Sequence, residues 1–523
     1  MKEFRVAGIC VPEKNYMVDI SGKIAEIKKL IDKGDYFTIN RARQYGKTTT
    51  LYELRKHLAN EYLVIKISFE GLGDESFSSP EQFCPTFTEQ IAEALQSPSI
   101  TVEQEYIDQW ENCNIKTFNA LKRHITKMCR DKKVVLLIDE VDRTSDNRVF
   151  LHFLSVLRSK FLAREGGDGY TFHSVILAGV YDIKNIKLKM INEGLYTPTE
   201  AEGKIYNSPW NIAVNFKVDM SFNPTEISTM LNEYENDYNT GMDITKISEE
   251  IYDYTNGYPF LVSRMCQCID EELNRIWTSE SIESAVEIML KEKNTLFDDL
   301  IKNIEAYPDL KKSLYELLFL GINKAFNIDN ATVNLGHMFG YFQNENNQIK
   351  VSNKIFEMRI YNYFISENEI SGDTNVKLPQ KSEITGSGRF DMELCLKKFA
   401  QHYAEIYKQK DAEFLERHGG LLFLTYLKPL INGHGFFYIE TQTNDFKIDI
   451  IVNYENEQFI IELKIWHGKK LHEAAYKQLA NYIKIKNADA GYLLTFDFRK
   501  ESNKDKKAEW IEYNGEKIYD IIV

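Results

Sequence analysis

Residues 35–58, DYFTINRARQYGKTTTLYELRKHL, predict a strand, a tight loop and an amphipathic helix in succession. The loop closes on Gly46-Lys47-Thr48-Thr49, directly before the predicted helix. Backbone N–H groups at a helix N-terminus can surround phosphates, a lysine can reach the β and γ oxygens, and a threonine hydroxyl can bind Mg²⁺. We therefore predict that Gly46, Lys47, Thr48 and Thr49 bind ATP and that Thr48 is also a metal ligand.

A second stretch, KKVVLLIDEVDR (residues 132–143), supplies the acidic half of such a site. Its five consecutive apolar residues predict a buried strand of a parallel sheet, and this strand ends in Asp139 and Glu140. Asp139 would hold Mg²⁺ through water, and Glu140 would polarise the attacking water. The usual phosphate-loop pattern has glycine where this chain has Arg41, yet the loop and the acidic pair together predict an ATPase.

Two further segments of the N-terminal half predict elements of the same domain. Residues 173–183 predict another buried strand, and Asp182 near its end is either a γ-phosphate sensor or, as we prefer, a helix cap. Farther on, Asn223 or Thr225 is expected to cap a helix, and Pro259 is expected to begin another.

Three arginines of this half could reach a nucleotide. Arg264, on the helix expected from Pro259, would face either the nucleotide or solvent. Arg158 and Arg164 are both candidates for an arginine finger, and the sequence offers no way to choose between them.

A different kind of site is predicted near the C-terminus, where KIDIIV (447–452) and QFIIELKIW (458–466) form a hairpin pattern. Glu462 and Lys464 are two apart in a strand and so share a sheet face, and Asp449 can join them from the neighbouring strand. Glu440 lies on the strand expected before these two. Carboxylates bind a hard cation through oxygen, so we predict that Asp449, Glu462 and Glu440 bind Mg²⁺.

Lys464 would position the attacking water or stabilise charge on a phosphate, which makes the site a candidate metal-dependent phosphodiesterase. The following helix, HEAAYKQLANYI (472–483), places Gln478 and Tyr482 one turn apart, and we include Gln478 among the catalytic candidates. Glu416 is either a further ligand or a solvated helix carboxylate. Residues 464–486 hold six lysines and one acid, a basic stripe that could track a phosphate backbone.

Both sites resemble known families. Tyr36 to Thr48 reads Tyr-Phe-x-x-x-Arg-x-Arg-x-x-Gly-Lys-Thr, and residues 1 to about 290 resemble the AAA-ATPase-like domain of a bacterial family related to STAND-type and AAA+ ATPases. Arg41 fits this resemblance, because that family tends to lack the first glycine. The pattern Asp449-x12-Glu462-x-Lys464 with Gln478-x-x-x-Tyr482 resembles the PD-(D/E)XK nuclease superfamily, which the same family often carries at its C-terminus.

The predicted fold class is α/β, in five parts that 523 residues easily accommodate. They are a P-loop ATPase core (1–220), a helical lid (221–300), a winged-helix-like module (301–366), a linker (367–388) and a nuclease-like domain (389–523). The linker is a polar stretch that contains Gly, Pro and Ser, lacks apolar periodicity and begins near Ser366. The wing of the middle module has no basic residue, so we favour a regulatory role for it over DNA binding.

Charge and composition narrow the function further. A net charge of −14 argues against a general nucleic-acid coat protein but allows one local basic surface. Seven scattered cysteines, no long apolar run and no signal-like start predict a cytoplasmic protein that does not contact membrane.

The resemblance implies this architecture but hardly any biological role. We predict an ATP-regulated, Mg²⁺-dependent nuclease that acts on DNA rather than RNA, in bacterial defence or mobile-element control, with a homo-oligomer or protein partner also open. One rival is a STAND-like signalling ATPase whose nuclease-like domain only binds nucleic acid or a protein. A second rival is a scaffold that binds ATP without turnover.

Overall fold

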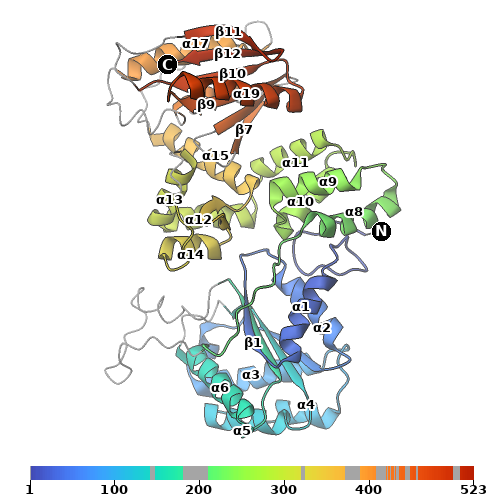
Figure 1. Cartoon of the computed structure of the whole chain (residues 1–523). Helices are drawn as coiled ribbons and strands as arrows, with labels where there is room; N and C mark the ends of the chain where they lie inside the picture. Colours follow the sequence, from blue (N-terminus) through green and yellow to red (C-terminus); the bar gives the residue numbers. More distant parts are fainter. Residues whose placement is uncertain are drawn as a thin grey trace, which may run out of the picture. The chain divides into compact units, whose positions relative to one another are not determined.

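The computed structural model describes residues 2–141, 148–180, 210–319, 324–371, 384, 389–407, 420, 422–424, 426–428, 430–431, 435–441, 448–454, 457–498 and 507–523. The protein has an α/β fold that divides into two compact units (Figure 1). The first unit comprises Met1–Glu292 and Asn334–Phe342, and the second comprises Lys293–Val333 and Gln343–Val523. Within the described residues, no helix combines the length and the apolarity that crossing a membrane requires.

A four-stranded parallel sheet forms the centre of the first unit. Its strands, in the order β1-β4-β3-β2, are β1 (Tyr36–Asn40), β4 (Ser174–Gly179), β3 (Val134–Asp139) and β2 (Leu63–Ser68). Every residue of β3 and β4 is buried, which explains why both read as unbroken runs of Val, Ile and Leu. The predicted strands around residues 35, 134 and 173 are thereby confirmed. A parallel bridge from Phe37 to Val214 extends the pairing beyond β1.

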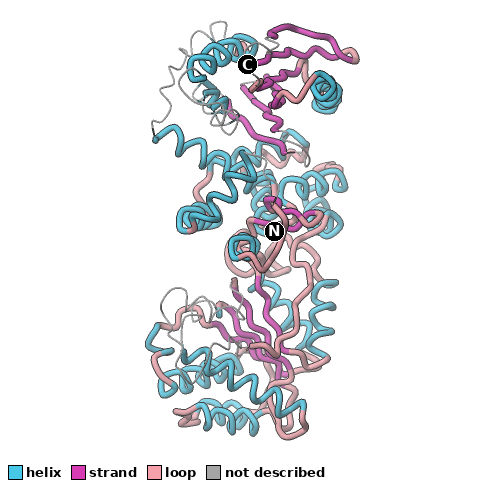
Figure 2. Tube along the Cα trace, turned by 60° about the vertical axis from the view of Figure 1, so that its left-hand side comes forward, coloured by secondary structure: helices cyan, strands magenta, loops and turns pink. Residues whose placement is uncertain are grey.

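Helices cover both faces of this sheet (Figures 1 and 2), and each face has its own hydrophobic core. On one face lie α1 (Ser21–Asp32) and α2 (Lys47–Leu58), which contribute Ile27 and Leu54. The other face is covered by α3 (Pro80–Leu95), α4 (Gln104–Glu111), α5 (Phe118–Met128) and α6 (Arg148–Glu165), with a short 3₁₀ turn at Asp74–Phe77. This three-layer arrangement leaves the carboxyl edge of the strands for the site.

Helices α8 (Pro224–Tyr238), α9 (Ile244–Thr255), α10 (Pro259–Glu271) and α11 (Ser279–Lys291) complete the first unit. The side chain of Asn223 accepts the N–H of Glu226 while the Glu226 carboxylate accepts that of Asn223, so Asn223 rather than Thr225 caps α8. Pro259 is the first residue of α10, as the sequence predicts.

The middle of the chain has the predicted order of helices, hairpin and helix. It comprises α12 (Thr295–Ala306), α13 (Pro308–Phe319), α14 (Ala331–Met338), β5 (Phe342–Glu345), β6 (Gln348–Val351) and α15 (Lys354–Ser371). The helical periodicity that runs from 279 to 304 in the sequence is interrupted in the structure. Asn294 breaks it, because its side chain accepts the N–H of Phe297 and begins a new helix.

The C-terminal part of the second unit is a six-stranded mixed sheet in the order β11-β12-β10-β9-β8-β7. Its strands are β7 (Gly435–Thr441), β8 (Ile448–Tyr454), β9 (Glu457–Ile465), β10 (Gly491–Phe496), β11 (Lys507–Tyr513) and β12 (Glu516–Ile522). Helix α19 (Lys469–Lys486) packs through Leu479 and Ile483 on the face that carries Ile460 and Leu493. Helix α17 (Met392–Tyr407) contacts the opposite face, where Phe399 meets Phe496.

Candidate functional sites

The predicted phosphate loop lies where β1 ends and α2 begins. Gly46 is the N-cap residue of α2 with φ of +74°, a left-handed conformation that glycine adopts without strain. Lys47 is buried, and its Nζ donates to the carbonyl oxygens of Arg41 at 3.0 Å and Ala42 at 2.9 Å. The lysine therefore lies within its own loop, at the helix N-terminus where a phosphate would bind.

Arg41, which stands where the usual pattern has glycine, points its side chain toward residues 216–218. Its Nη2 donates to the carbonyl of Val218 at 2.7 Å, its Nη1 donates to that of Asn40, and its guanidinium lies over the ring of Phe216. The backbone of Arg41 does not adopt a left-handed conformation. The loop at this position therefore needs no glycine, and the arginine fastens its start to the 216–218 segment.

Asp139 and Glu140 follow the central strand β3. Asp139 is 2% exposed, its Oδ1 accepts the N–H of Glu140 at 3.0 Å, and its Oδ2 lies 3.9 Å from Nζ of Lys66 on β2. Burial lowers the pKa of Lys66, and the nearby Asp139 carboxylate opposes that shift in part. The neighbouring lysine compensates the buried carboxylate in this structure.

The two segments are brought to one edge by the strand order. β4 lies between β1 and β3, and all three are parallel, so the phosphate loop and Asp139 both follow carboxyl ends of the same sheet. Neighbouring strands are about 4.8 Å apart, which puts β1 and β3 about 10 Å from each other. That separation suits a bound triphosphate between loop and acid.

Backbone strain is concentrated at this edge. Seven of the ten described non-glycine residues with positive φ are asparagines, which tolerate it, and the other three are Gln44, Glu140 and Arg275. Gln44 at φ of +55° lies in the phosphate loop, and Glu140 at +54° is the carboxylate predicted to polarise the attacking water. Such conformations persist where the surrounding structure enforces them, and they are frequent at functional sites.

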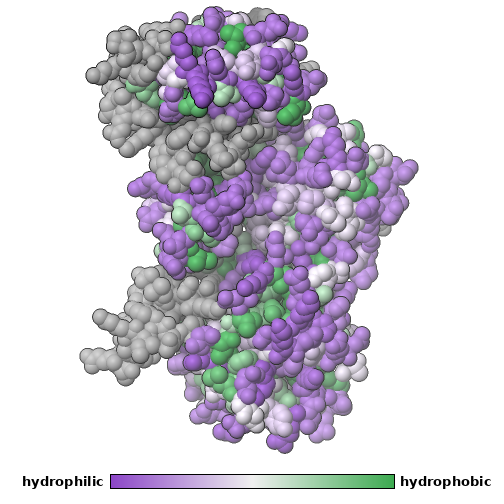
Figure 3. Space-filling model, viewed as in Figure 1, coloured by the Kyte–Doolittle hydropathy of each residue, from purple (hydrophilic) through white to green (hydrophobic). Residues whose placement is uncertain are grey.

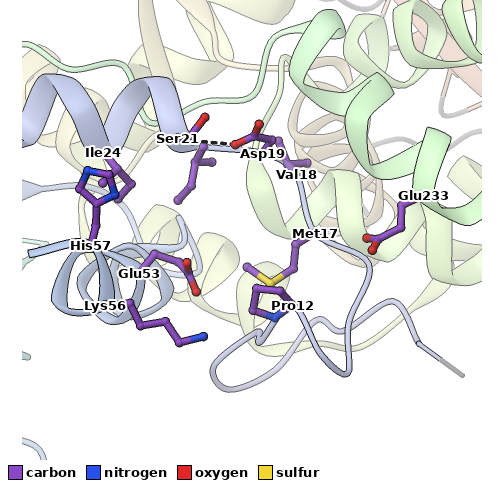
Figure 4. Close-up of a pocket in the computed structure, with 11 residues that line it drawn as sticks. Pro12, Met17, Val18, Asp19, Ser21, Ile24, Glu53, Lys56, His57 and Glu233 are labelled. Atoms are coloured by element: carbon purple, nitrogen blue, oxygen red, sulfur yellow. Dashed lines mark hydrogen bonds between the residues drawn. The ribbon is translucent and has the colours of Figure 1, made fainter. Parts of the chain in front are cut away.

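Beside α2 there is a cavity of about 420 Å³ that the sequence does not reveal (Figure 4). The N-terminal segment supplies its apolar wall, α2 supplies polar groups, and α8 supplies a carboxylate. Its lining residues are Pro12, Met17, Val18, Asp19, Ile20, Ser21, Ile24, Glu53, Lys56, His57 and Glu233. The same N-terminal segment reaches the phosphate loop, because Thr49 Oγ1 accepts the N–H of Cys10 at 3.4 Å. Thr48 is partly exposed.

Two of the three arginines considered as nucleotide ligands have structural partners, whereas Nε of Arg158 is buried without a hydrogen-bond partner among the described residues. Arg264 donates to Glu292 at 2.9 Å and to Glu272 at 2.9 Å, within the helices α10 and α11 and the residues that follow them. Arg164 donates to the carbonyl oxygens of Gly34 and Phe172. Asp182, the sensor candidate, lies outside the described residues, as does Glu416 of the second site.

In the second unit, the register of three strands aligns the predicted acidic positions. Glu440 on β7 is directly opposite Asp449 on β8, and Asp449 is directly opposite Glu462 on β9. Positions directly opposite in a ladder lie on the same face of the sheet, about 5 Å apart from strand to strand. The structure therefore places 440, 449 and 462 in one row, which is the arrangement that the hairpin pattern predicts.

Glu462 and Lys464 form a nearly buried ion pair. Nζ of Lys464 lies 2.8 Å from Oε1 of Glu462, and the two side chains are 16% and 1% exposed. A carboxylate this deep is costly unless it is paired or binds a cation. The site thus holds the Glu462 carboxylate in place, with the Lys464 ammonium beside it.

Helix α19 lies over the same face, because Ile460, two residues before Glu462, packs beneath it. Gln478 Nε2 and the Tyr482 hydroxyl are both buried and have no hydrogen-bond partner within the part of the chain that the structure describes. They are one turn apart on α19, so both lie on one side of the helix. These two groups are available to a bound molecule.

Sequence reasoning missed a further buried carboxylate on the face that carries Glu462. Asp520 on β12 continues the row of Glu462 through Leu493, and its Oδ2 accepts from His472 at 2.9 Å, from Tyr476 and from Lys507 at 3.1 Å. Burial alone would raise the pKa of Asp520, but the hydrogen bonds from His472 and Tyr476 bring it below the usual value. No spacing in the sequence links residues 472, 476, 507 and 520, so only the fold reveals them.

The first unit has the strand order, phosphate loop and acidic strand end of a P-loop ATPase, and the second has the acidic row and lysine of a metal-dependent nuclease. The chain belongs to the AAA-like domain family, whose model matches residues 14–365. A model of the PD-(D/E)XK nuclease superfamily matches residues 435–507. The protein is therefore an enzyme that joins an ATPase-like part to a nuclease domain.

Solved structures similar to this chain include the Walker-type ATPase paby2304 of Pyrococcus abyssi, which is 12% identical over 68% of this chain and 99% of its own, with a TM-score of 0.47. They also include the Aeropyrum pernix ORC2 protein in its ADPNP–ADP complexes, which is 11% identical over 67% of this chain and 93% of its own, with a TM-score of 0.33. No curated protein matches the chain.

Proposed function

We propose that this protein binds and hydrolyses ATP and is an ATP-regulated, Mg²⁺-dependent nuclease that acts on DNA rather than RNA. The observation that carries the proposal is the acidic row at 440, 449 and 462 with Lys464 bonded to Glu462. The metal ligands that Glu440, Asp449 and Glu462 offer are all carboxylate oxygens, which Mg²⁺ prefers.

At the nuclease site, Asp449 and Glu462 would hold the metal, with Glu440 beside them. When bound, Mg²⁺ polarises the phosphate and lowers the pKa of a bound water. Lys464 lies beside Glu462. A phosphate bound to the metal at Glu462 would therefore be near the lysine, which could stabilise the negative charge that develops on it. Gln478 would orient Lys464 or the substrate backbone: its buried Nε2 can donate to a phosphate oxygen, and its Oε1 can accept from a lysine.

At the ATPase site, Gly46, Lys47, Thr48 and Thr49 would bind the phosphates, and Thr48 and Asp139 would hold Mg²⁺. Glu140 would orient the attacking water. The cavity beside α2 would receive the nucleoside. Its apolar residues Met17 and Val18 suit a base, and Glu53, one helical turn beyond Thr49, suits an amino or hydroxyl group.

Support for a nucleic-acid substrate comes from α19, which has five lysines and one glutamate in a chain of net charge −14. Lys470 and Lys477 are exposed and form no ion pair among the described residues, and hydrophilic residues predominate where α19 lies in Figure 3. Such uncompensated lysines favour a phosphate backbone as the partner.

The alternative is a STAND-like signalling ATPase whose nuclease domain only binds nucleic acid or a protein partner. Supercoiled plasmid incubated with Mg²⁺ or Mn²⁺, with and without ATP, separates the two. Wild type should nick or linearise the plasmid, Lys464→Ala should not, and Lys517→Ala, an exposed lysine on the opposite face of the sheet, should cut normally. Retention of plasmid without cleavage by the wild type would favour the alternative.

The cellular setting that we propose is bacterial defence or mobile-element control. Cells that express the protein should then establish a foreign plasmid less often than cells that express Glu462→Ala. If the plasmid is established equally often in both kinds of cell, the proposed cellular setting is wrong, although the biochemical proposal is unaffected.

A further inference from the structure

The phosphate loop is covered by a segment that is distant in sequence. We call Asn334–Phe342, the part of the first unit that follows residue 333, the latch segment. A Cβ atom at Gly340 would lie 2.9 Å from Cβ of Ala42 and 3.6 Å from a ring carbon of Tyr258. Ala42 is 4% exposed, so the backbone at Gly340 is packed directly on the loop.

The latch segment has a defined structure of its own. Phe339 and Tyr341 are buried, their rings are 5.6 Å apart, and the N–H of Tyr341 donates to the carbonyl of Gly336 at 2.8 Å. Nδ1 of His337 lies 3.1 Å from the carbonyl oxygen of Phe342. The segment therefore consists of the last residues of α14 and the turn that follows them, held together by these contacts.

The loop under the latch segment is in a conformation that occupies its catalytic lysine. Ala42 receives a hydrogen bond from Lys47 and contacts Gly340, and Arg43 receives one from the Tyr258 hydroxyl. A phosphate that binds Lys47 competes with the carbonyl oxygens of Arg41 and Ala42 for its ammonium group. The residue against which the latch segment packs is thus one that nucleotide binding disturbs.

The chain connects this contact to the second unit at both ends. Residues 293–333 precede the latch segment and residues 343–523 follow it, and both belong to the second unit. The latch segment is therefore joined through the backbone, at both of its ends, to the unit that carries the nuclease domain.

We propose that the latch segment couples the two activities: packed on Ala42 it favours the loop with Lys47 folded in, and ATP binding releases it. This inference rests on the proposed function for the identity of the nucleotide. Coupling of this kind is reciprocal, so a change that weakens the latched state should tighten ATP binding.

The test uses Gly340→Ala in the full chain, with Gly241→Ala as its control. Both glycines are left-handed, with φ of +74° and +78°, so an alanine strains both backbones alike, but the Cβ at 241 meets nothing within 4 Å. Calorimetry with ATP and Mg²⁺ should give roughly tenfold tighter binding for Gly340→Ala than for the control. Equal or weaker binding would overturn the proposal.

Hydrogen–deuterium exchange on the wild-type chain gives a second readout that does not depend on a variant. Addition of ATP and Mg²⁺ should protect residues 41–50 and speed exchange at residues 334–342. Protection of the loop with no change in the latch segment would refute the coupling alone. No protection at the loop would instead count against the nucleotide site itself.

Discussion

Among the side chains that the structure describes near the candidate nuclease site, Asp520 is the most deeply buried charge, and its replacement by asparagine tests how the domain is held together. The residue is fully buried, and one oxygen accepts from His472, Tyr476 and Lys507. His472 and Tyr476 belong to α19, the helix that carries Gln478, so this network ties the helix to the sheet.

The size of the effect follows from the partners. Breaking a buried ion pair costs about 3–5 kcal/mol when the remaining charge is left alone. Here Lys507 is 29% exposed and still has an ion pair with Glu509 at 3.1 Å, and asparagine can still accept one hydrogen bond. We therefore expect Asp520→Asn to lower the free energy of unfolding by about 2–3 kcal/mol. The exposed Asp489→Asn should change stability by less than about 0.5 kcal/mol.

The cost should also depend on pH in a predictable sense. The folded state lowers the pKa of Asp520, so its ionised form stabilises the protein fully above the unfolded value of about 3.9. That contribution is lost as pH falls through the lower folded pKa, and the gap between wild type and Asp520→Asn should close there. Urea unfolding of the full chain, followed by tryptophan fluorescence with Trp466 against His472 as a reporter, measures both quantities. A gap below about 1 kcal/mol at neutral pH, or one that persists unchanged in acid, would refute this account.

Three other outcomes are expected. Lys47→Ala should weaken ATP binding about 10–100-fold, because it removes one charged donor to the phosphates. If calorimetry finds an unchanged affinity for ATP, the nucleotide site has been assigned to the wrong residues. Glu140→Gln should bind ATP normally and lose hydrolysis by at least about 100-fold, so phosphate release near the wild-type rate would assign the attacking water to another residue. The predicted linker (367–388) begins too early, because α15 extends to Ser371. Limited proteolysis should cut first in the rest of this linker and release a folded fragment of residues about 390–523, and a chain that resists cleavage there would place the domain boundary elsewhere.

Local sequence signals predict much of this fold because they coincide with buried elements. The apolar runs before Asp139 and around residue 176 are wholly buried parallel strands, so their hydrophobicity has a single explanation. The runs around Asp449 and Glu462 are likewise strands, but neighbouring residues such as Ile450 and Ile451 are both buried because helices cover both faces of the sheet. The register of this hairpin is therefore set by the short connection between the strands rather than by the apolar pattern alone.

Long-range contacts escape such reasoning. The contact of Gly340 with Ala42 joins residues almost three hundred positions apart, and neither residue type signals the other. Arg41 shows the same limit of local sequence patterns. It can stand where the usual pattern has glycine because its side chain binds the carbonyl of Val218 and lies over Phe216, which are distant in sequence. The Asp520 network needs three elements to assemble before its members meet.

The central claim is that two separate catalytic sites lie on one chain, and paired assays of Glu462→Ala test it most directly. Plasmid cleavage with Mg²⁺ and ATP hydrolysis are measured on the same preparation, with Asp449→Ala alongside. We predict that cleavage falls more than about 100-fold in both variants while ATP hydrolysis stays within about twofold of wild type. Cleavage that survives both substitutions, or ATP hydrolysis that falls with it, would contradict the account.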